Sequence, residues 1–91
     1  MRSRGNLMYD VLFTETAIKQ MKKLDGSVQK RIIKSLERIR IRPEAFVTRL
    51  VGQPYFRLRV GDYRVILDIK GSQLIILVVY IGHRRNVYKN N

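Results

Sequence analysis

The chain has 91 residues, and 19 lysine and arginine residues against 7 aspartate and glutamate residues give it a formal net charge of +12. At 45% hydrophobic residues it is too apolar for a disordered polycation, so we expect one folded domain with a single core. The absence of cysteine excludes disulfides, zinc–thiolate sites and cysteine nucleophiles, and one histidine cannot form a metal cluster by itself. The excess charge indicates a polyanionic partner, most often nucleic acid, or an acidic protein; the alternative is a basic surface without a dedicated ligand.

The apolar runs of the sequence are short. The longest, Leu74 to Ile81, falls far below the roughly 20 residues that a membrane-spanning helix needs. Residues 1–6 lack the apolar stretch of a signal peptide, so we expect a cytoplasmic protein with no membrane partner. We expect residues 1–8 to form a flexible head and residues 9–91 to form the single domain.

The first half of the chain predicts a strand followed by two helices. Tyr9–Phe13 suits a short strand, and Thr14 is placed to cap a helix that has Glu15 in its first turn. A second helix is predicted from about Ser27 to Arg40, before Pro43. Because the connection at Asp25-Gly26 is short, the helices form an antiparallel hairpin. Its predicted core residues are Ala17, Ile18, Met21 and Leu24 on the first helix and Val28, Ile32, Ile33, Leu36 and Ile39 on the second.

The second half predicts a three-stranded antiparallel meander after a loop through Gly52 and Pro54. Its strands are Tyr55–Val60, Tyr63–Lys70 and Gln73–Ile81, separated by turns at Gly61-Asp62 and Gly71-Ser72. The last strand is apolar on every residue after its start, so we expect it in the interior of the sheet with both faces covered. The fold class is therefore α+β in the order β-α-α-β-β-β, with the N-terminal strand and the helical hairpin packed on one face of a mainly antiparallel sheet.

A two-residue turn at Gly61-Asp62 sets the register of the first two strands of the meander. One side of this strand pair is then apolar, with Val60 opposite Tyr63, Leu58 opposite Val65 and Phe56 opposite Leu67. On the other side Arg59 lies opposite Arg64, Arg57 opposite Ile66 and Tyr55 opposite Asp68. Two opposed arginines disfavour folding by a few tenths to ~1 kcal/mol, so their pairing is explained if an anion binds between them. The alternative is that both side chains extend into water.

The segment after the last strand groups the only histidine, His83, with Arg84, Arg85 and Tyr88. Histidine exchanges a proton near neutral pH, arginine presents a fork that suits phosphate oxygens, and tyrosine stacks on bases. A basic tail alone is usually solvated. Together with the arginines of the meander, this tail predicts a site for a phosphodiester.

The acidic residues of this half indicate which cleavage chemistry such a site could use. After Glu44 only Asp62 and Asp68 remain, and they form no obvious cluster for a metal-dependent nuclease. RNA cleavage without a metal needs no such cluster, because the substrate's own 2′-OH attacks the adjacent phosphorus and leaves a 2′,3′-cyclic phosphate. The protein then holds the geometry, removes a proton and stabilises the developing charge. We therefore expect no cofactor.

Three segments resemble the RelE/ParE superfamily of toxins from toxin–antitoxin pairs. They are Arg49-Leu50-Val51-Gly52, the stretch from Tyr55 to Ile66 that contains Tyr63-Arg64, and Gly82-His83-Arg84-Arg85-Asn86-Val87-Tyr88. The resemblance covers residues 9–88 and implies a RelE-like fold. It also implies a ribonuclease that enters the ribosomal A site and cleaves the mRNA codon there.

By position, the resemblance implies that Arg59, Arg64 and Arg84 bind the reacting phosphate and that Tyr88 stacks on a base. It further implies RNA binding by Arg49, Arg57 and Arg85, and it leaves open which of Arg84 and Arg85 binds the phosphate. Some relatives have lysines where Arg57 and Arg59 stand, and a lysine there is a candidate proton acceptor. Arginine is always protonated, so His83 is the better candidate here.

The resemblance also implies partners. A RelB-type antitoxin with acidic, amphipathic segments would wrap the toxin, and operator DNA would be contacted mainly through that antitoxin. Five cations on the helices would attract such an acidic antitoxin: Lys22, Lys23, Lys30, Lys34 and Arg38. The alternative is that these side chains are simply solvated. Two further functions stay open, a ParE-like inhibitor of DNA gyrase without nuclease activity and a catalytically inactive module that binds RNA or the antitoxin.

Overall fold

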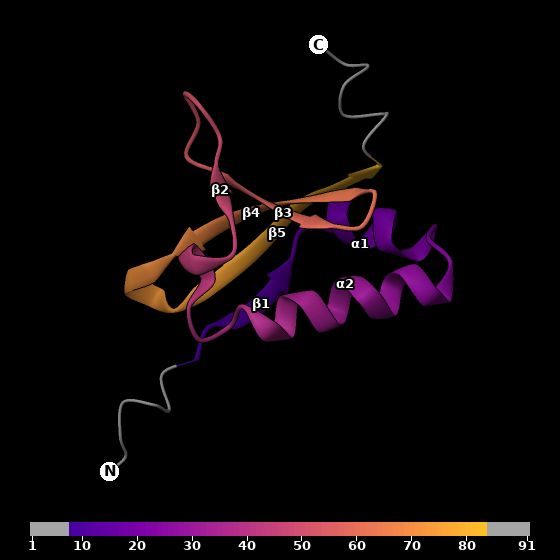
Figure 1. Cartoon of the computed structure of the whole chain (residues 1–91), viewed down its shortest axis with the longest axis horizontal. Helices are drawn as coiled ribbons and strands as arrows, with labels where there is room; N and C mark the ends of the chain where they lie inside the picture. The colour runs from indigo at the N-terminus through magenta and orange to yellow at the C-terminus, as the bar shows by residue number, and fades with distance from the viewer. Residues whose placement is uncertain (1–7, 84–91) are drawn as a thin grey trace.

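The structure is a computed structural model that describes residues 8–83 (Figure 1). The elements in chain order are β1 (Asp10–Phe13), α1 (Glu15–Lys22), α2 (Gly26–Arg38), β2 (Thr48–Arg49), β3 (Phe56–Val60), β4 (Tyr63–Lys70) and β5 (Ile75–His83). Two short 3₁₀ turns, η2 (Pro43–Ala45) and η3 (Gly71–Gln73), precede β2 and β5. Among the residues described, no helix is both long enough and apolar enough to cross a membrane.

The strands form one sheet in the order β1-β5-β4-β3-β2. β1 pairs with β5 in parallel, and the other three pairings are antiparallel. The predicted α+β class, the element order and the mainly antiparallel sheet are therefore confirmed. The N-terminal strand is itself part of the sheet, at the edge beside β5. The structure adds one strand that was not predicted, the two-residue β2, which pairs with the start of β3.

Thr14 joins α1 to the sheet, as well as capping the helix as predicted. The Ala17 N–H donates to Thr14 Oγ1 at 3.1 Å, and the Thr14 hydroxyl donates to the Val79 carbonyl of β5 at 3.1 Å. One turn later, Gln20 Oε1 accepts a hydrogen bond of 2.6 Å from the Ile81 N–H. β1 ends opposite Val78, so this glutamine satisfies a backbone donor on the part of β5 that β1 does not reach.

Both helices cover the same face of the sheet, α1 along β5 and α2 beside β3 (Figure 1). Alternation along the strands places one set of apolar side chains on this helix-covered face. The buried core consists of Ala17, Ile32, Leu36, Ile39, Leu58, Val60, Val65, Leu67, Ile76, Val78 and Ile81. Ile18 and Ile33, which were predicted as core residues, are instead 42% and 41% exposed. Each helix has too wide an apolar stripe for one sheet face to cover.

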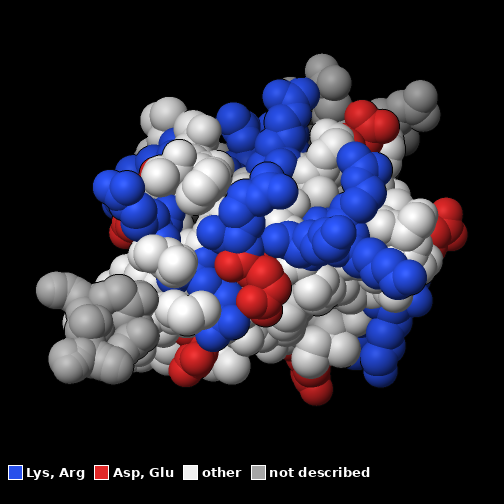
Figure 2. All heavy atoms as spheres, turned by 60° about the horizontal axis from the view of Figure 1, so that its bottom comes forward, with Lys and Arg blue, Asp and Glu red and all other residues white. Residues whose placement is uncertain are grey.

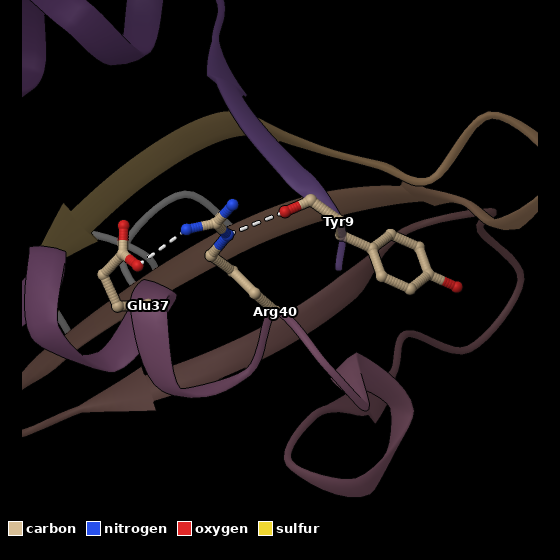
Figure 3. A network of polar contacts seen from close by, with 3 residues as sticks. All are labelled: Tyr9, Glu37 and Arg40. Carbon is tan, nitrogen blue, oxygen red and sulfur yellow. Dashed lines mark hydrogen bonds and ion pairs between the residues drawn. The ribbon is translucent and has the colours of Figure 1, made fainter. Parts of the chain in front are cut away.

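Arg40, just after α2, ties that helix to the first strand (Figure 3). Its Nε donates to the Tyr9 carbonyl at 2.7 Å, and its Nη1 forms an ion pair with Glu37 at 2.9 Å. The Tyr9 N–H in turn donates to the Arg40 carbonyl at 2.9 Å. These bonds hold the chain where it enters the sheet, because they satisfy both backbone groups of Tyr9.

Candidate functional site

The predicted register of β3 and β4 is confirmed. The pairs are Phe56–Leu67, Arg57–Ile66, Leu58–Val65, Arg59–Arg64 and Val60–Tyr63; the pairing of Tyr55 with Asp68 is not seen, because β3 begins at Phe56. Gly61 has φ +59°, a backbone conformation that glycine adopts without steric cost, so the strands reverse within two residues. Arg59 and Arg64 therefore face each other directly across the strands.

Arg57, Arg59 and Arg64 lie on the face of the sheet that the helices leave uncovered, and we call these three residues the arginine face. Arg57 and Arg59 are two residues apart on one strand, a separation of about 7 Å. Arg64 is only 9% exposed, whereas Arg59 is exposed and Arg57 is half-buried. A buried guanidinium is fixed in position, and an exposed one opposite it can close on a ligand, so Arg59 and Arg64 are suited to clamping a phosphate. We call this pair the arginine clamp.

His83 lies at the same end of the sheet but on the other face. It pairs with Tyr63, and its ring makes an edge-on contact with that tyrosine at 5.1 Å between centroids. Its neighbour Gly82 pairs with Arg64, so His83 is one residue beyond the arginine clamp and points to the helix-covered side. Here it lines a pocket of about 270 Å³ between the end of α1 and β5, together with Gln20 and Lys23.

Arg49 is also separated from the arginine face. It pairs with Phe56, and its guanidinium carbon lies 5.3 Å from the centre of that ring, a cation–π contact. Phe56 shares its face of β3 with Leu58 and Val60. Of the predicted site residues, the structure thus brings together Arg57, Arg59 and Arg64, and it leaves Arg49 and His83 on the opposite side of the sheet.

The remaining predicted site residues, Arg84, Arg85 and Tyr88, lie outside the described residues. No group of three or more histidine, aspartate and glutamate residues within the described part of the chain is arranged to hold a metal ion. The residue types present suit an anion, because guanidinium groups offer several hydrogen-bond donors and a permanent positive charge.

Three cations of α2 also lie at the site, although the sequence pointed to Lys34 and Arg38 only as contacts of an antitoxin and did not point to Arg31. Arg31, Lys34 and Arg38 line a pocket together with Arg59, at the edge where α2 meets the end of β3. Figure 2, in which the side of the molecule with α2 comes forward, shows lysine and arginine side chains gathered over this side, with an acidic patch among them. Their spacing on the helix was visible in the sequence, but their proximity to Arg59 depends on how α2 packs against the sheet.

Comparisons with known proteins identify the family and the fold. The sequence profile of the ParE toxin of the type II toxin–antitoxin system parDE matches residues 11–88. A RelE-like toxin protein of Escherichia coli is 32% identical over 81 residues, which cover 86% of this chain and 85% of that protein. The mRNA interferase toxin RelE of E. coli K12 is 26% identical over 81 residues, with the same coverage. The toxin–antitoxin complex RelBE of E. coli contains a chain with a TM-score of 0.71 and 28% identity, over 82% of this chain and 95% of that one.

Proposed function

Because the chain belongs to the ParE toxin family within the RelE/ParE superfamily, and is thus a toxin of the type II toxin–antitoxin class, we propose that it is an endoribonuclease that cleaves mRNA in the ribosomal A site. The name of its E. coli relative, mRNA interferase, supports this activity. The observation that carries the proposal is the direct opposition of Arg59 and Arg64 on the uncovered face of the sheet. Two like charges held together in this way favour an anionic ligand.

In the proposed reaction, the 2′-oxygen of the RNA forms a bond to the adjacent phosphorus and the bond to the 5′-oxygen breaks. The products are a 2′,3′-cyclic phosphate and a 5′-hydroxyl. The leaving 5′-oxygen takes up a proton from the solvent while the 2′-OH loses one, so no water is consumed overall. Arg59, Arg64 and Arg84 stabilise the charge that accumulates on the phosphate oxygens in the transition state. By its burial Arg64 is better preorganised than the exposed Arg59, since its side chain has less freedom to lose when the substrate arrives.

The other proposed roles concern the proton and the bases. His83 removes the proton of the 2′-OH, since no arginine can accept one. It stands next to Gly82, the partner of Arg64, so the RNA has to pass around the end of the sheet to meet both residues. Tyr88 stacks on a base, and Arg49, Arg57 and Arg85 hold the strand.

The proposal is tested with purified toxin, ribosomes and a defined mRNA. Mapping of the RNA ends should reveal cuts within A-site codons, with a cyclic phosphate on the upstream fragment. Arg64→Ala and Arg84→Ala should each restore growth to cells that express the toxin while the protein remains folded. Unchanged toxicity of both variants would contradict the assignment of the phosphate clamp.

The match to the ParE toxin profile supports a second candidate, a toxin that inhibits DNA gyrase and cleaves nothing. The same preparation distinguishes the two. Intact mRNA together with inhibited gyrase supports this second function, whereas A-site cleavage with active gyrase supports the first. If RNA is bound but neither activity is found, the chain is a catalytically inactive binding module.

We also propose an acidic, RelB-type antitoxin as partner, which would carry the contacts to operator DNA. Between α1 and α2 lies a largely apolar groove of about 510 Å³, whose lining includes Met21 and Ile33 as well as Lys30 and Lys34. An amphipathic segment with acidic flanks would fit a groove that combines apolar and basic side chains. Ile33→Asp should weaken antitoxin binding at least about tenfold, because it puts a charge among the apolar side chains of the groove. Since Ile33 is 41% exposed, the fold should persist; unchanged affinity would exclude the groove.

A further inference from the structure

We infer that the pocket between α2 and the end of β3 is a second phosphate subsite, which holds a non-scissile backbone phosphate of the RNA strand whose neighbouring phosphate lies in the arginine clamp. This inference rests on the proposed ribonuclease function. The pocket has a volume of about 280 Å³, and its lining includes Arg31, Lys34, Ser35, Arg38, Arg59 and Gly61. It therefore combines four cations with one hydroxyl donor.

The helix side of this pocket is a polar stripe with regular spacing. Arg31, Lys34, Ser35 and Arg38 occupy positions i, i+3, i+4 and i+7 of α2, which lie on one face of a helix. The ion pairs found among residues 8–83 join Arg40 to Glu37 and Lys70 to Asp68, so none of these helix cations is neutralised by a carboxylate there. Like charges at this spacing destabilise a helix, and a bound anion would remove that repulsion.

Gly61 lets one of these cations lie against the turn between β3 and β4. A Cβ atom at Gly61 would lie 2.5 Å from Nη2 and 3.2 Å from Cζ of Arg31, so any larger residue would displace the guanidinium. The Arg31 guanidinium thus lies against the turn, beside the strand that carries Arg59.

Arg59 connects the pocket to the proposed reaction centre. It lines the pocket and also lies opposite Arg64. A strand with one phosphate at the clamp would therefore carry a neighbouring phosphate toward α2. Arginine forks and a hydroxyl are typical partners of phosphate oxygens. The pocket exposes more polar than apolar surface, unlike the groove of Met21 and Ile33, so it suits a phosphate better than an amphipathic protein segment.

The test is a thermodynamic cycle on RNA binding. The probe is a short single-stranded RNA with a 2′-deoxy nucleotide at the cleavage position. It is compared with a series of otherwise identical RNAs, in each of which one phosphate is replaced by a neutral methylphosphonate. With the wild-type protein, one non-scissile replacement should weaken binding about fivefold to tenfold. K34Q/R38Q should weaken binding of the unmodified probe by a similar factor. For this double variant, that same phosphate replacement should change the affinity for RNA less than about twofold.

The matched control is K19Q/R42Q, which removes one lysine and one arginine from exposed positions outside the pocket. It should remain as sensitive as wild type to the replaced phosphate, and thermal unfolding should verify that both double variants are folded. The inference is overturned if K34Q/R38Q stays sensitive to every replacement, because the pocket would then act only through general charge. It is also overturned if no single phosphate replacement weakens RNA binding by the wild-type protein more than the others do. The same holds if K34Q/R38Q binds RNA normally and only its binding to the acidic antitoxin is weakened.

Failure of the proposed nuclease function would look different. In that case the cycle would still locate the phosphate subsite, while ribosome-bound mRNA would stay uncut by the wild-type protein. Conversely, the wild-type protein could cleave mRNA while the effects of K34Q/R38Q and of the phosphate replacements on RNA binding were independent of each other. That result would support the nuclease function and exclude the subsite.

Discussion

Arg64 is buried on the face of the sheet that the helices leave open, and it is the only charged residue classed as buried among those described. Arg64→Lys keeps the positive charge and much of the volume but replaces a planar fork with a point charge. We expect the rate of mRNA cleavage on ribosomes to fall about 10²- to 10³-fold, the usual effect of removing one preorganised donor to a transition-state oxyanion. End-labelled mRNA in single-turnover reactions measures this rate.

The stability of the same variant provides its control. A lysine at this position keeps the positive charge and the apolar stem, so the free energy of unfolding in urea should fall by no more than about 1 kcal/mol. Arg57→Lys, on the same face but half-buried, should lose less than about tenfold in rate. Equal losses in both variants would indicate that the whole face attracts RNA and that Arg64 has no special role.

Arg40 has a structural role that is separate from any ligand. Arg40→Ala removes the 2.7 Å bond from Nε to the Tyr9 carbonyl, which is partly buried, and the ion pair to Glu37. We expect the free energy of unfolding to fall by about 1–2 kcal/mol, mostly from the carbonyl left without its charged donor. Since Glu37 is exposed, the ion pair itself should contribute little.

Arg42→Ala is the matched control for Arg40→Ala, because it removes the same charge two residues away from an exposed position. Its free energy of unfolding should stay within about 0.5 kcal/mol of wild type. Urea unfolding followed by circular dichroism measures both variants. Similar losses in the two would mean that net charge, and not the bond to Tyr9, determines stability here.

The turn between β3 and β4 depends on Gly61 for two separate reasons. Gly61 has a positive φ and leaves room for Arg31. Gly61→Ala should lower the free energy of unfolding by about 1–2 kcal/mol through the left-handed backbone alone, and more if Arg31 resists displacement. Thermal unfolding measures the loss.

Two further variants separate backbone strain from the contact with Arg31. Gly61→Asn tolerates the left-handed conformation but still displaces the guanidinium, so its remaining loss reports the contact. Gly26→Ala adds a Cβ with no atom within 4 Å and should stabilise the protein by about 0.5 kcal/mol. If Gly26→Ala destabilised the protein as much as Gly61→Ala, the loss at Gly61 would be explained neither by its positive φ nor by its contact with Arg31.

The same turn explains which parts of the fold were predictable from the sequence. Strict alternation on both sides of Gly61-Asp62 left one register, so the opposition of Arg59 and Arg64 could be foreseen. β2 could not, because two residues have no periodicity and their pairing is defined only by β3. The start of β5 was placed too early, since the chain turns through η3 and Leu74, which has φ 55°, before the strand begins at Ile75.

The position of His83 shows a similar limit within the site. The predicted last strand stopped at Ile81, which left the histidine in a tail free to approach the arginines. β5 continues through His83, so pairing with Tyr63 assigns its side chain to the helix-covered face. The residue types of the candidate site could be named from the sequence. The face on which His83 lies could not, because it depends on whether the last strand includes Gly82 and His83. The contribution of α2 to the pocket at Arg59 needed the tertiary packing itself.

At the scale of the whole molecule, the net charge of +12 is divided among surfaces with different roles. Arg57, Arg59 and Arg64 occupy the uncovered sheet face, and the cations of α2 continue from them around the edge of β3. Lys30 and Lys34 border the apolar groove. Under the proposed function, RNA would bind on one side of the chain and an acidic antitoxin on an adjoining side. Arg31 and Lys34 line both pockets, so an antitoxin seated in the groove would occupy cations that the RNA needs.

This distribution predicts how binding and cleavage respond to salt and to the sugar of the substrate. If the clamp and the pocket at α2 engage about three phosphates, the affinity for single-stranded RNA should fall about 20-fold between about 50 and about 200 mM salt. A DNA strand of the same sequence should show a similar salt dependence, because phosphates and not sugars provide the attraction. A single 2′-deoxy nucleotide at the cleavage position should change affinity less than about twofold and abolish cleavage, because the attacking oxygen is gone. Filter binding and end mapping measure the two effects; cleavage of the deoxy substrate would exclude attack by the RNA's own hydroxyl.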